Sequence, residues 1–189
     1  MEPTKRFYTS EREEWRAWLS ENYDKEKEIW FVFPTKDSGE KSLSYNDAVE
    51  EALCFGWIDS TAKAADSMHG LRRFTPRREG SPYSRPNIER LIWLDGREML
   101  MPEVKAAVAE LVSTPYEFPK DIIDAIKENA AAWENYKGFT ESYKRIRVAY
   151  IDAARHRPAE FEKRLRSFIR KTAENKLICG YGGIDKYYK

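Results

Sequence analysis

The residues best suited to chemistry are six arginines that lie close together between positions 72 and 90. Only two acidic residues, Glu79 and Glu89, occur in the same stretch. A guanidinium group binds a carboxylate or a phosphate through paired hydrogen bonds. The end of the stretch is predicted to open a helix, whose first backbone N–H groups have no partner within the helix. This pattern predicts a site for a small anionic or polar ligand.

Seven residues form this candidate ligand-binding site. Trp57 and Asp59 lie two positions apart on a predicted strand, so they share one face of it. Asn87 and Arg90 lie one helical turn apart, so both can point the same way. We expect the arginines to hold negative charge, the serine and the asparagine to form hydrogen bonds, and the aromatic rings to supply an apolar wall. The complete set is Trp57, Asp59, Arg77, Tyr83, Ser84, Asn87 and Arg90.

Two other interpretations of these residues remain open. The arginines are structural if they pair with the acidic N-terminal region, because residues 1–60 carry eight basic and fourteen acidic side chains. Asp59 then forms an ion pair with one of them. In the second interpretation the protein is an enzyme, and Asp59 is a general base in the same pocket.

Other catalytic or metal-binding arrangements find little support. Cys54 follows Glu50 and Glu51 by four and three positions, and neighbouring carboxylates disfavour the thiolate that a nucleophile needs. The two histidines, His69 and His156, have no further ligands at metal-binding spacing. We therefore expect no catalytic residue, no metal and no cofactor.

A basic region near the C-terminus suggests an alternative function. Residues 144–171 carry ten basic and three acidic side chains, although the whole chain has a net charge of only +1. Lys163, Arg166 and Arg170 align at helical spacing, and Lys144 and Arg147 precede them on another predicted helix. Such a basic strip binds nucleic acid backbones without reading bases. A nucleic-acid-binding stress protein is therefore the alternative, while a solvated helix face explains the same pattern.

The predicted elements that position these residues give an α+β fold. The residue types predict strands at 29–33, 57–61 and 70–78, and helix caps at Ser10 and Ser44. We expect a small antiparallel sheet of about three strands with helices packed on it. After Pro119 the apolar spacing predicts three antiparallel helices. The expected divisions are an α+β domain over 1–112, a helical module over 119–176 and a mobile tail over 177–189.

The composition indicates a folded protein of the cytosol. Hydrophobic residues make up 41% of the chain and aromatic residues 14%, which is enough for a core. Only two cysteines occur, so a disulfide scaffold is excluded. No apolar run approaches the roughly 20 residues of a membrane span, and the N-terminal residues contain no apolar core of a secretion signal. We expect no membrane partner.

Three motifs resemble the YdeI/OmpD-associated family of bacterial proteins, also described as bacteriocin-protection proteins. They are Ala-Leu-Cys-Phe-Gly-Trp-Ile-Asp at 52–59, Arg-Phe-Thr-Pro-Arg at 73–77 and Ser84-x-x-Asn87-x-x-Arg90. The helical region from Pro119 to about Lys176 is similar to the C-terminal module of that family. The resemblance implies a link to stress or bacteriocin tolerance but no particular reaction. We therefore expect a non-catalytic cytosolic protein that binds a small anionic or polar ligand or a protein partner.

Overall fold

The chain forms two compact units in the computed structural model, which describes residues 5–180 and 183–188. The first unit combines Met1–Pro82 with Leu91–Glu110, and the second combines Tyr83–Arg90 with Leu111–Lys189. Two helices therefore belong to both units, α3 (Arg85–Asp95) and α4 (Pro102–Ser113). The second unit differs from the helical module that the sequence predicts, because it also contains the first turn of α3.

A four-stranded sheet forms the centre of the first unit. Its strand order is β1-β2-β4-β3, with β2 and β3 antiparallel to β4 and β1 parallel to β2. The three predicted strands are present, and the expected sheet lacks only β1. That strand is two residues long, too short for the alternation by which a strand is recognised in a sequence. The strands are β1 (Arg6–Phe7), β2 (Ile29–Pro34), β3 (Trp57–Ala64) and β4 (His69–Pro76).

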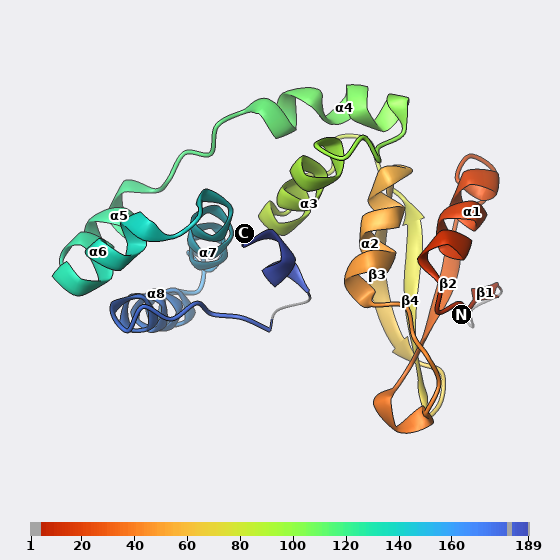
Figure 1. Ribbon diagram of the computed structural model, residues 1–189, viewed down its shortest axis with the longest axis horizontal. Helices are drawn as coiled ribbons and strands as arrows, with labels where there is room; N and C mark the ends of the chain where they lie inside the picture. The colour runs from red at the N-terminus through yellow and green to blue at the C-terminus, as the bar shows by residue number, and fades with distance from the viewer. Residues whose placement is uncertain (1–4, 181–182, 189) are drawn as a thin grey trace. The chain divides into compact units, whose positions relative to one another are not determined.

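Two helices, α1 (Arg12–Asn22) and α2 (Tyr45–Cys54), pack on one face of this sheet (Figure 1). Their contact with the sheet is largely aromatic. The ring of Trp15 lies 5.1 Å from that of Phe31 and 5.5 Å from that of Phe74, and Trp18 meets Trp57 at 5.9 Å between centroids. Tilted and edge-on ring pairs of this kind bury much apolar area with defined geometry. The mixed α+β class expected from the sequence is therefore confirmed.

The two predicted helix caps have different outcomes. Ser44 caps α2 as expected, because its side chain accepts a hydrogen bond from the backbone N–H of Asp47. Ser10 does not cap α1, whose N-cap residue is Glu11. The hydroxyl of Thr9 accepts from the Glu11 N–H and donates to the Glu14 carboxylate. The chain therefore enters α1 one residue later than a capping box at Ser10 predicts.

A buried ionic network joins α1 to α2. Glu50 and Glu51 are 0% and 1% exposed, and Arg12 donates to both, at 2.8 Å and 2.5 Å. Arg16 donates to Glu51 at 2.6 Å, and Asn46 donates to Glu50 at 2.8 Å. Burial lowers the pKa of Arg12, but hydrogen bonds and attraction from the two glutamates outweigh it, so the pKa lies above its ordinary value. Glu50 and Glu51 are therefore neutralised from within residues 1–60, whereas Glu28 and Asp59 of the same region pair with Arg73 and Arg72.

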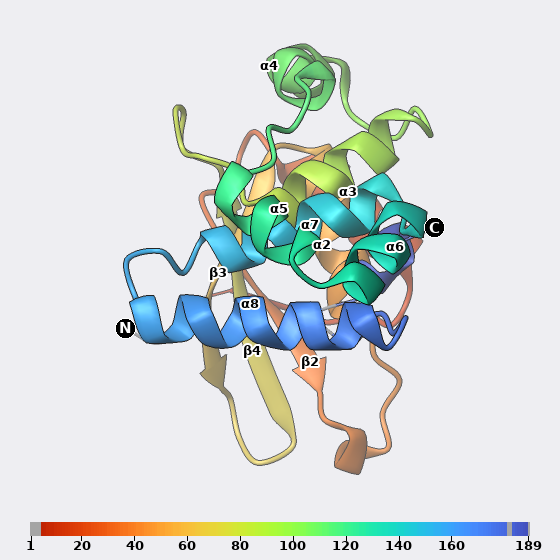
Figure 2. The ribbon, with the colours of Figure 1, turned by 90° about the vertical axis from the view of Figure 1, so that its left-hand side faces the viewer.

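The second unit contains four helices after α4, where the sequence predicts three. The expected helix through Ile122 and Trp133 is divided in two, because Asn129 is the N-cap residue of α6 and accepts a hydrogen bond from the N–H of Ala132. Figures 1 and 2 show α8 lying along one side of α6 and α7. The helices are α5 (Lys120–Lys127), α6 (Ala130–Gly138), α7 (Glu141–Asp152) and α8 (Pro158–Ala173).

Three residues of the expected mobile tail, Ile184, Tyr187 and Tyr188, are buried. A short 3-10 helix, η2 (Ile184–Tyr187), buries Ile184 and Tyr187. Thr140 and Ser142 at the start of α7 donate hydrogen bonds to backbone carbonyls of Tyr188 and Tyr187. Tyr181 and Gly182, within the glycine-rich run that suggests mobility, lie outside the described residues. The contacts of η2 argue against mobility for residues 184–188.

No helix within residues 5–180 and 183–188 is both long and apolar enough to cross a membrane.

Replacing Arg12 by Met tests the buried network. The substitution keeps the apolar stem but removes the hydrogen bonds that Arg12 donates to the buried Glu50 and Glu51 carboxylates. We expect a loss of about 3 kcal/mol in the free energy of unfolding, measured by urea denaturation, because removing one partner of a buried ion pair is strongly destabilising. The control is Arg78→Met, an exposed arginine for which we expect a change within about 0.5 kcal/mol. Equal losses for the two variants would contradict the network's role.

The second prediction concerns pH. His69 lies 2.8 Å from Glu40 and 2.9 Å from Asp66, and the hydrogen bonds to these carboxylates raise its pKa above 6.5. A raised folded-state pKa gives stability that is complete below about pH 6.5 and is lost as the pH rises through the folded value. We expect His69→Gln to remove this part of the pH dependence of the unfolding free energy. The control is His156→Gln, and a pH profile unchanged by His69→Gln would exclude the contribution.

Candidate functional site

The structure places two predicted site residues, Trp57 and Asp59, on the helix-covered face of the sheet. Trp57 is 1% exposed, and its indole N–H donates to the carbonyl oxygen of Tyr23 at 3.0 Å. The Asp59 carboxylate accepts a hydrogen bond from Tyr45 at 2.7 Å and lies 3.7 Å from the guanidinium of Arg72. Trp57 is therefore part of the core, and Asp59 has the structural ion pair that was one of its two interpretations.

Arg77 lies on the other face of the sheet. It lines a hollow of about 210 Å³ together with Ile58 and Thr75, whose side chains alternate with those of Trp57 and Phe74. Its guanidinium donates to the backbone carbonyls of Ser81 and Pro82 at 2.9 Å and 3.1 Å. The structure therefore does not bring Arg77 together with Trp57 and Asp59.

The other four predicted residues belong to the second unit. Arg90 is 5% exposed and donates to the Asn87 side chain at 2.9 Å, with its guanidinium 5.9 Å from the ring of Tyr187. Tyr83 is half-buried, and Ser84 is exposed just before α3. Asn87 and Arg90 do meet, as their spacing predicts, but they bind each other. Because Arg77 lies on the opposite face of the sheet from Trp57 and Asp59, these three residues do not share the single pocket that the sequence predicts.

Glu89 explains why the start of α3 belongs to the second unit. Its carboxylate is 3% exposed and accepts from Arg145 on α7 at 2.6 Å and 2.9 Å. Arg85, one turn earlier on α3, donates to the same carboxylate at 2.8 Å and 2.5 Å. The hydrogen bonds to Glu89 raise the pKa of Arg145 despite its partial burial. This glutamate therefore holds two helices together and occupies one of the arginines that the sequence offers to a ligand.

The buried cation of the second unit that suits a ligand is Arg147 on α7. Arg147 is 4% exposed, and its Nη2 donates to the carbonyl oxygen of Ile178 and, at 2.6 Å, to the hydroxyl of Tyr188. Its Nε is buried and has no hydrogen-bond partner. No carboxylate among the described residues forms an ion pair with it. Arg147 is therefore a desolvated charge that is held in place by neutral oxygens and is not neutralised by any carboxylate of residues 5–180 and 183–188.

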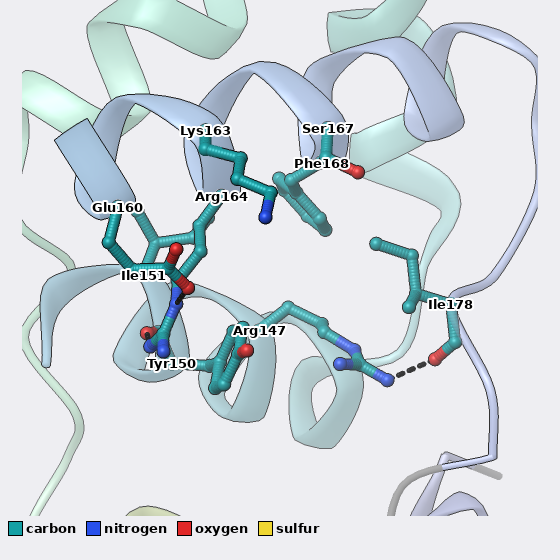
Figure 3. A pocket seen from close by; sticks show the side chains of 9 residues that line it. All are labelled: Arg147, Tyr150, Ile151, Glu160, Lys163, Arg164, Ser167, Phe168 and Ile178. Atoms are coloured by element: carbon teal, nitrogen blue, oxygen red, sulfur yellow. Dashed lines mark hydrogen bonds and ion pairs between the residues drawn. The ribbon is translucent and has the colours of Figure 1, made fainter. Parts of the chain in front are cut away.

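A cavity of about 260 Å³, here called the α7–α8 cavity, opens beside Arg147 (Figure 3). Its floor is apolar, since Ile151 and Phe168 are each 1% exposed. In Figure 3 the side chains of Arg147 and Lys163 point into the same space from α7 and α8. The cavity is lined by Arg147, Tyr150, Ile151, Glu160, Lys163, Arg164, Ser167, Phe168 and Ile178.

The charges around the α7–α8 cavity favour an anion. Glu160 is the acidic lining residue, and Arg164 donates to it at 2.8 Å, which lowers the pKa of the Glu160 carboxyl. Arg164 also donates to the Tyr150 carbonyl at 2.7 Å, so its position is set by the chain itself. Lys163 forms no hydrogen bond or ion pair with the described residues. Two positive charges, Arg147 and Lys163, therefore remain after the Glu160–Arg164 pair is formed.

A second cavity of about 280 Å³ lies at the start of α3 and is mostly apolar. One of the site residues predicted from the sequence, Ser84, lines this second cavity. Arg147 and Tyr150 line this cavity as well as the α7–α8 cavity. The other lining residues are Arg85, Pro86, Ile146, Ala149, Ala153 and Ile184.

The burial of Arg147 could have been predicted from its position in the sequence, although its charge led to its assignment to an exposed basic strip. Arg147 lies four positions after Tyr143 and four before Ile151, within the apolar spacing of α7, and both of these residues are buried. Lys144 is also buried, at 8% exposed, and its ammonium group donates a hydrogen bond to the Glu141 carboxylate at 2.9 Å. The expected basic strip therefore lacks Lys144 and Arg147, and its exposed part is limited to α8.

No group of three or more metal-ligating side chains lies together within the described ranges 5–180 and 183–188. Cys54 is fully buried, and burial, followed by the charge of Glu51, raises the pKa of its thiol to about 12. The sequence argument against a Cys54 nucleophile agrees with this environment.

Comparison with known families divides the chain in two. Residues 115–175 match the family model described as "Bacteriocin-protection, YdeI or OmpD-Associated", which confirms the expected resemblance. Residues 7–107, which contain all three motifs at 52–59, 73–77 and 84–90, match a separate model described as a domain of unknown function (DUF8412), so the confirmed resemblance lies in the helical region and not in those motifs. No curated protein and no solved structure matches the chain.

Thiol labelling tests the environment of Cys54. Cys179 is exposed, whereas Cys54 is buried with a raised pKa. At pH 8 we expect a disulfide reagent such as dithiobis(nitrobenzoate) to modify one thiol per native chain quickly, and two in urea. Cys179→Ser removes the fast reaction. Fast labelling of the native Cys179→Ser variant would show that Cys54 is accessible.

Proposed function

The chain belongs to the family described as domain of unknown function DUF8412 and carries a YdeI/OmpD-associated module in its second unit, and for this module we propose the non-catalytic binding of a small anionic ligand. The ligand occupies the α7–α8 cavity, between Arg147 and Lys163. In this proposal Arg147 and Lys163, and not the arginines at 72–90, supply the positive charge that binds the ligand. None of the seven residues predicted from the sequence lines the α7–α8 cavity, and Ser84 lines the neighbouring one.

The observation that carries this proposal is the buried, unneutralised charge of Arg147. A buried charge without a counter-charge costs several kcal/mol. The carbonyl of Ile178 and the hydroxyl of Tyr188 satisfy only part of its hydrogen-bonding capacity, and Nε remains without a partner. An anion in the cavity would neutralise the guanidinium where little water screens the interaction. The cavity is therefore better matched to an anion than to a neutral ligand.

The lining of the α7–α8 cavity supports binding over catalysis. Ser167 is the potential nucleophile, and no histidine or unpaired carboxylate lines the cavity to activate it. Glu160 is held by Arg164, which makes it a poor general base. In the first unit Asp59 is engaged by Tyr45 and Arg72, which also argues against the enzyme interpretation.

We place the binding protein in the cytosol. Its two cysteines are unpaired, and Cys179 is exposed, which suits a reducing compartment. The family description mentions bacteriocin protection. We extend that role to this chain as part of the proposal, with ligand binding as its molecular basis.

Removing Lys163 tests the anion site without disturbing the core. Lys163 is exposed and forms no hydrogen bond with described residues, so Lys163→Ala is expected to fold normally. We expect the dissociation constants of acetate and inorganic phosphate, followed by NMR titration, to rise about fivefold because one of two cations is lost. The matched control is Arg166→Ala, an exposed cation on the same helix that does not line the cavity.

Two results would overturn the proposal. The first is that neither acetate nor phosphate shifts resonances of residues that line the α7–α8 cavity. The second is that Arg166→Ala weakens binding as much as Lys163→Ala does, since that would indicate a general effect of the charge on α8. Arg147→Lys gives an independent check, because it keeps the charge but removes the planar donors.

A further inference from the structure

We infer that the ligand of the α7–α8 cavity is a monocarboxylate that carries a single aromatic ring. This inference rests on the proposed function and narrows it from small anions to one chemical class. It follows from the composition of the cavity wall, from the number of desolvated charges and from the cavity volume.

The wall of the cavity requires a ligand with a large apolar part. Four of its lining residues, Tyr150, Ile151, Phe168 and Ile178, have largely apolar side chains. Figure 3 shows the Phe168 ring and the Ile178 side chain directed toward the space that Arg147 and Lys163 also face. A small hydrated anion such as phosphate would leave these groups against water. An aromatic ring would cover them and gain the favourable geometry of ring–ring contacts.

The charges favour a monoanion. Arg147 is 4% exposed and is the desolvated cation of the cavity, whereas Lys163 is exposed and keeps its hydration. A single carboxylate neutralises Arg147, and Lys163 remains available for its second oxygen. A dianion would need a second desolvated cation, and Arg164 already serves Glu160.

The volume limits the apolar part to one ring. A cavity of about 150 Å³ holds benzene. The α7–α8 cavity, at about 260 Å³, therefore has room for a ring together with a carboxylate and a short linker. It lies below the range of about 300–1,000 Å³ that is typical of sites for drug-sized ligands, such as nucleotides or larger cofactors.

The experiment compares a series of probes on the full chain. Acetate, phenylacetate, 3-phenylpropanoate, neutral 2-phenylethanol and phenyl phosphate are titrated by NMR or calorimetry. We expect phenylacetate or 3-phenylpropanoate to bind at least tenfold more tightly than acetate, because burial of a ring removes much apolar area from water. We expect 2-phenylethanol to bind at least tenfold more weakly than phenylacetate, because it cannot neutralise Arg147.

A variant that fills the cavity locates the ring. Ser167→Leu adds apolar volume at the wall, and we expect it to abolish the advantage of phenylacetate over acetate while acetate binding changes less than twofold. Ser167→Ala removes the hydroxyl without filling the space, so it should keep most of that advantage. Ala159→Leu, on the exposed surface of α8 and outside the cavity, is the matched control, and thermal unfolding verifies that all three variants fold.

The outcomes distinguish this inference from the proposed function. If no anion binds, both fail. If acetate and phenylacetate bind equally well, or if Ser167→Leu does not reduce the difference between them, the anion site stands and the aromatic ligand is excluded. If phenyl phosphate binds more tightly than both phenyl carboxylates, the monocarboxylate is excluded in favour of a dianion.

Discussion

A charge removed from water must be matched by an opposite charge or by several hydrogen bonds, and this requirement governs the interior of both units. In the first unit Glu50 and Glu51 are almost fully buried and are matched by Arg12 and Arg16. In the second unit Glu89 is matched by two arginines. Because these pairs join helices that are distant in sequence, they determine which helices can pack together. The arginines in these pairs, Arg12, Arg16, Arg85 and Arg145, are therefore occupied by carboxylates of the chain itself.

Arg147 departs from this pattern and so gives the C-terminal module its chemical character. It is buried, like the paired glutamates, but its neighbours are the rings of Tyr143 and Tyr188 and the carbonyl oxygen of Ile178. Burial raises the pKa of Tyr188 to about 12 although Arg147 opposes the rise, so the phenol stays neutral and cannot compensate the cation. The segment after α8 therefore holds the guanidinium without neutralising it. This arrangement links the proposed ligand site to the packing of η2, because Tyr188 follows η2 directly.

Particular residues show how far sequence reasoning reached. The strands at β2, β3 and β4, the Ser44 cap and the meeting of Asn87 with Arg90 follow from local spacing, and the structure contains them. The three-helix expectation was wrong because Asn129 takes a hydrogen bond from Ala132 and starts a new helix inside an apolar pattern that continues across it. The predicted role of Arg77 could not be judged from sequence, because its acceptors are backbone carbonyls of the following turn. A count of acidic side chains does not include such acceptors.

The sequence by itself determined the α+β class, the main strands and helices, the family of the C-terminal module and the inert character of Cys54. These properties depend on residue types at short spacing, where neighbours along the chain are also neighbours in space. Only the tertiary structure decided which cations are free. Arg12, Arg85 and Arg147 look alike in the sequence, yet the first two meet buried carboxylates and the third does not. The difference lies in partners that the fold supplies from elsewhere in the chain, and electrostatic compensation depends on distance in space and not on position in the sequence.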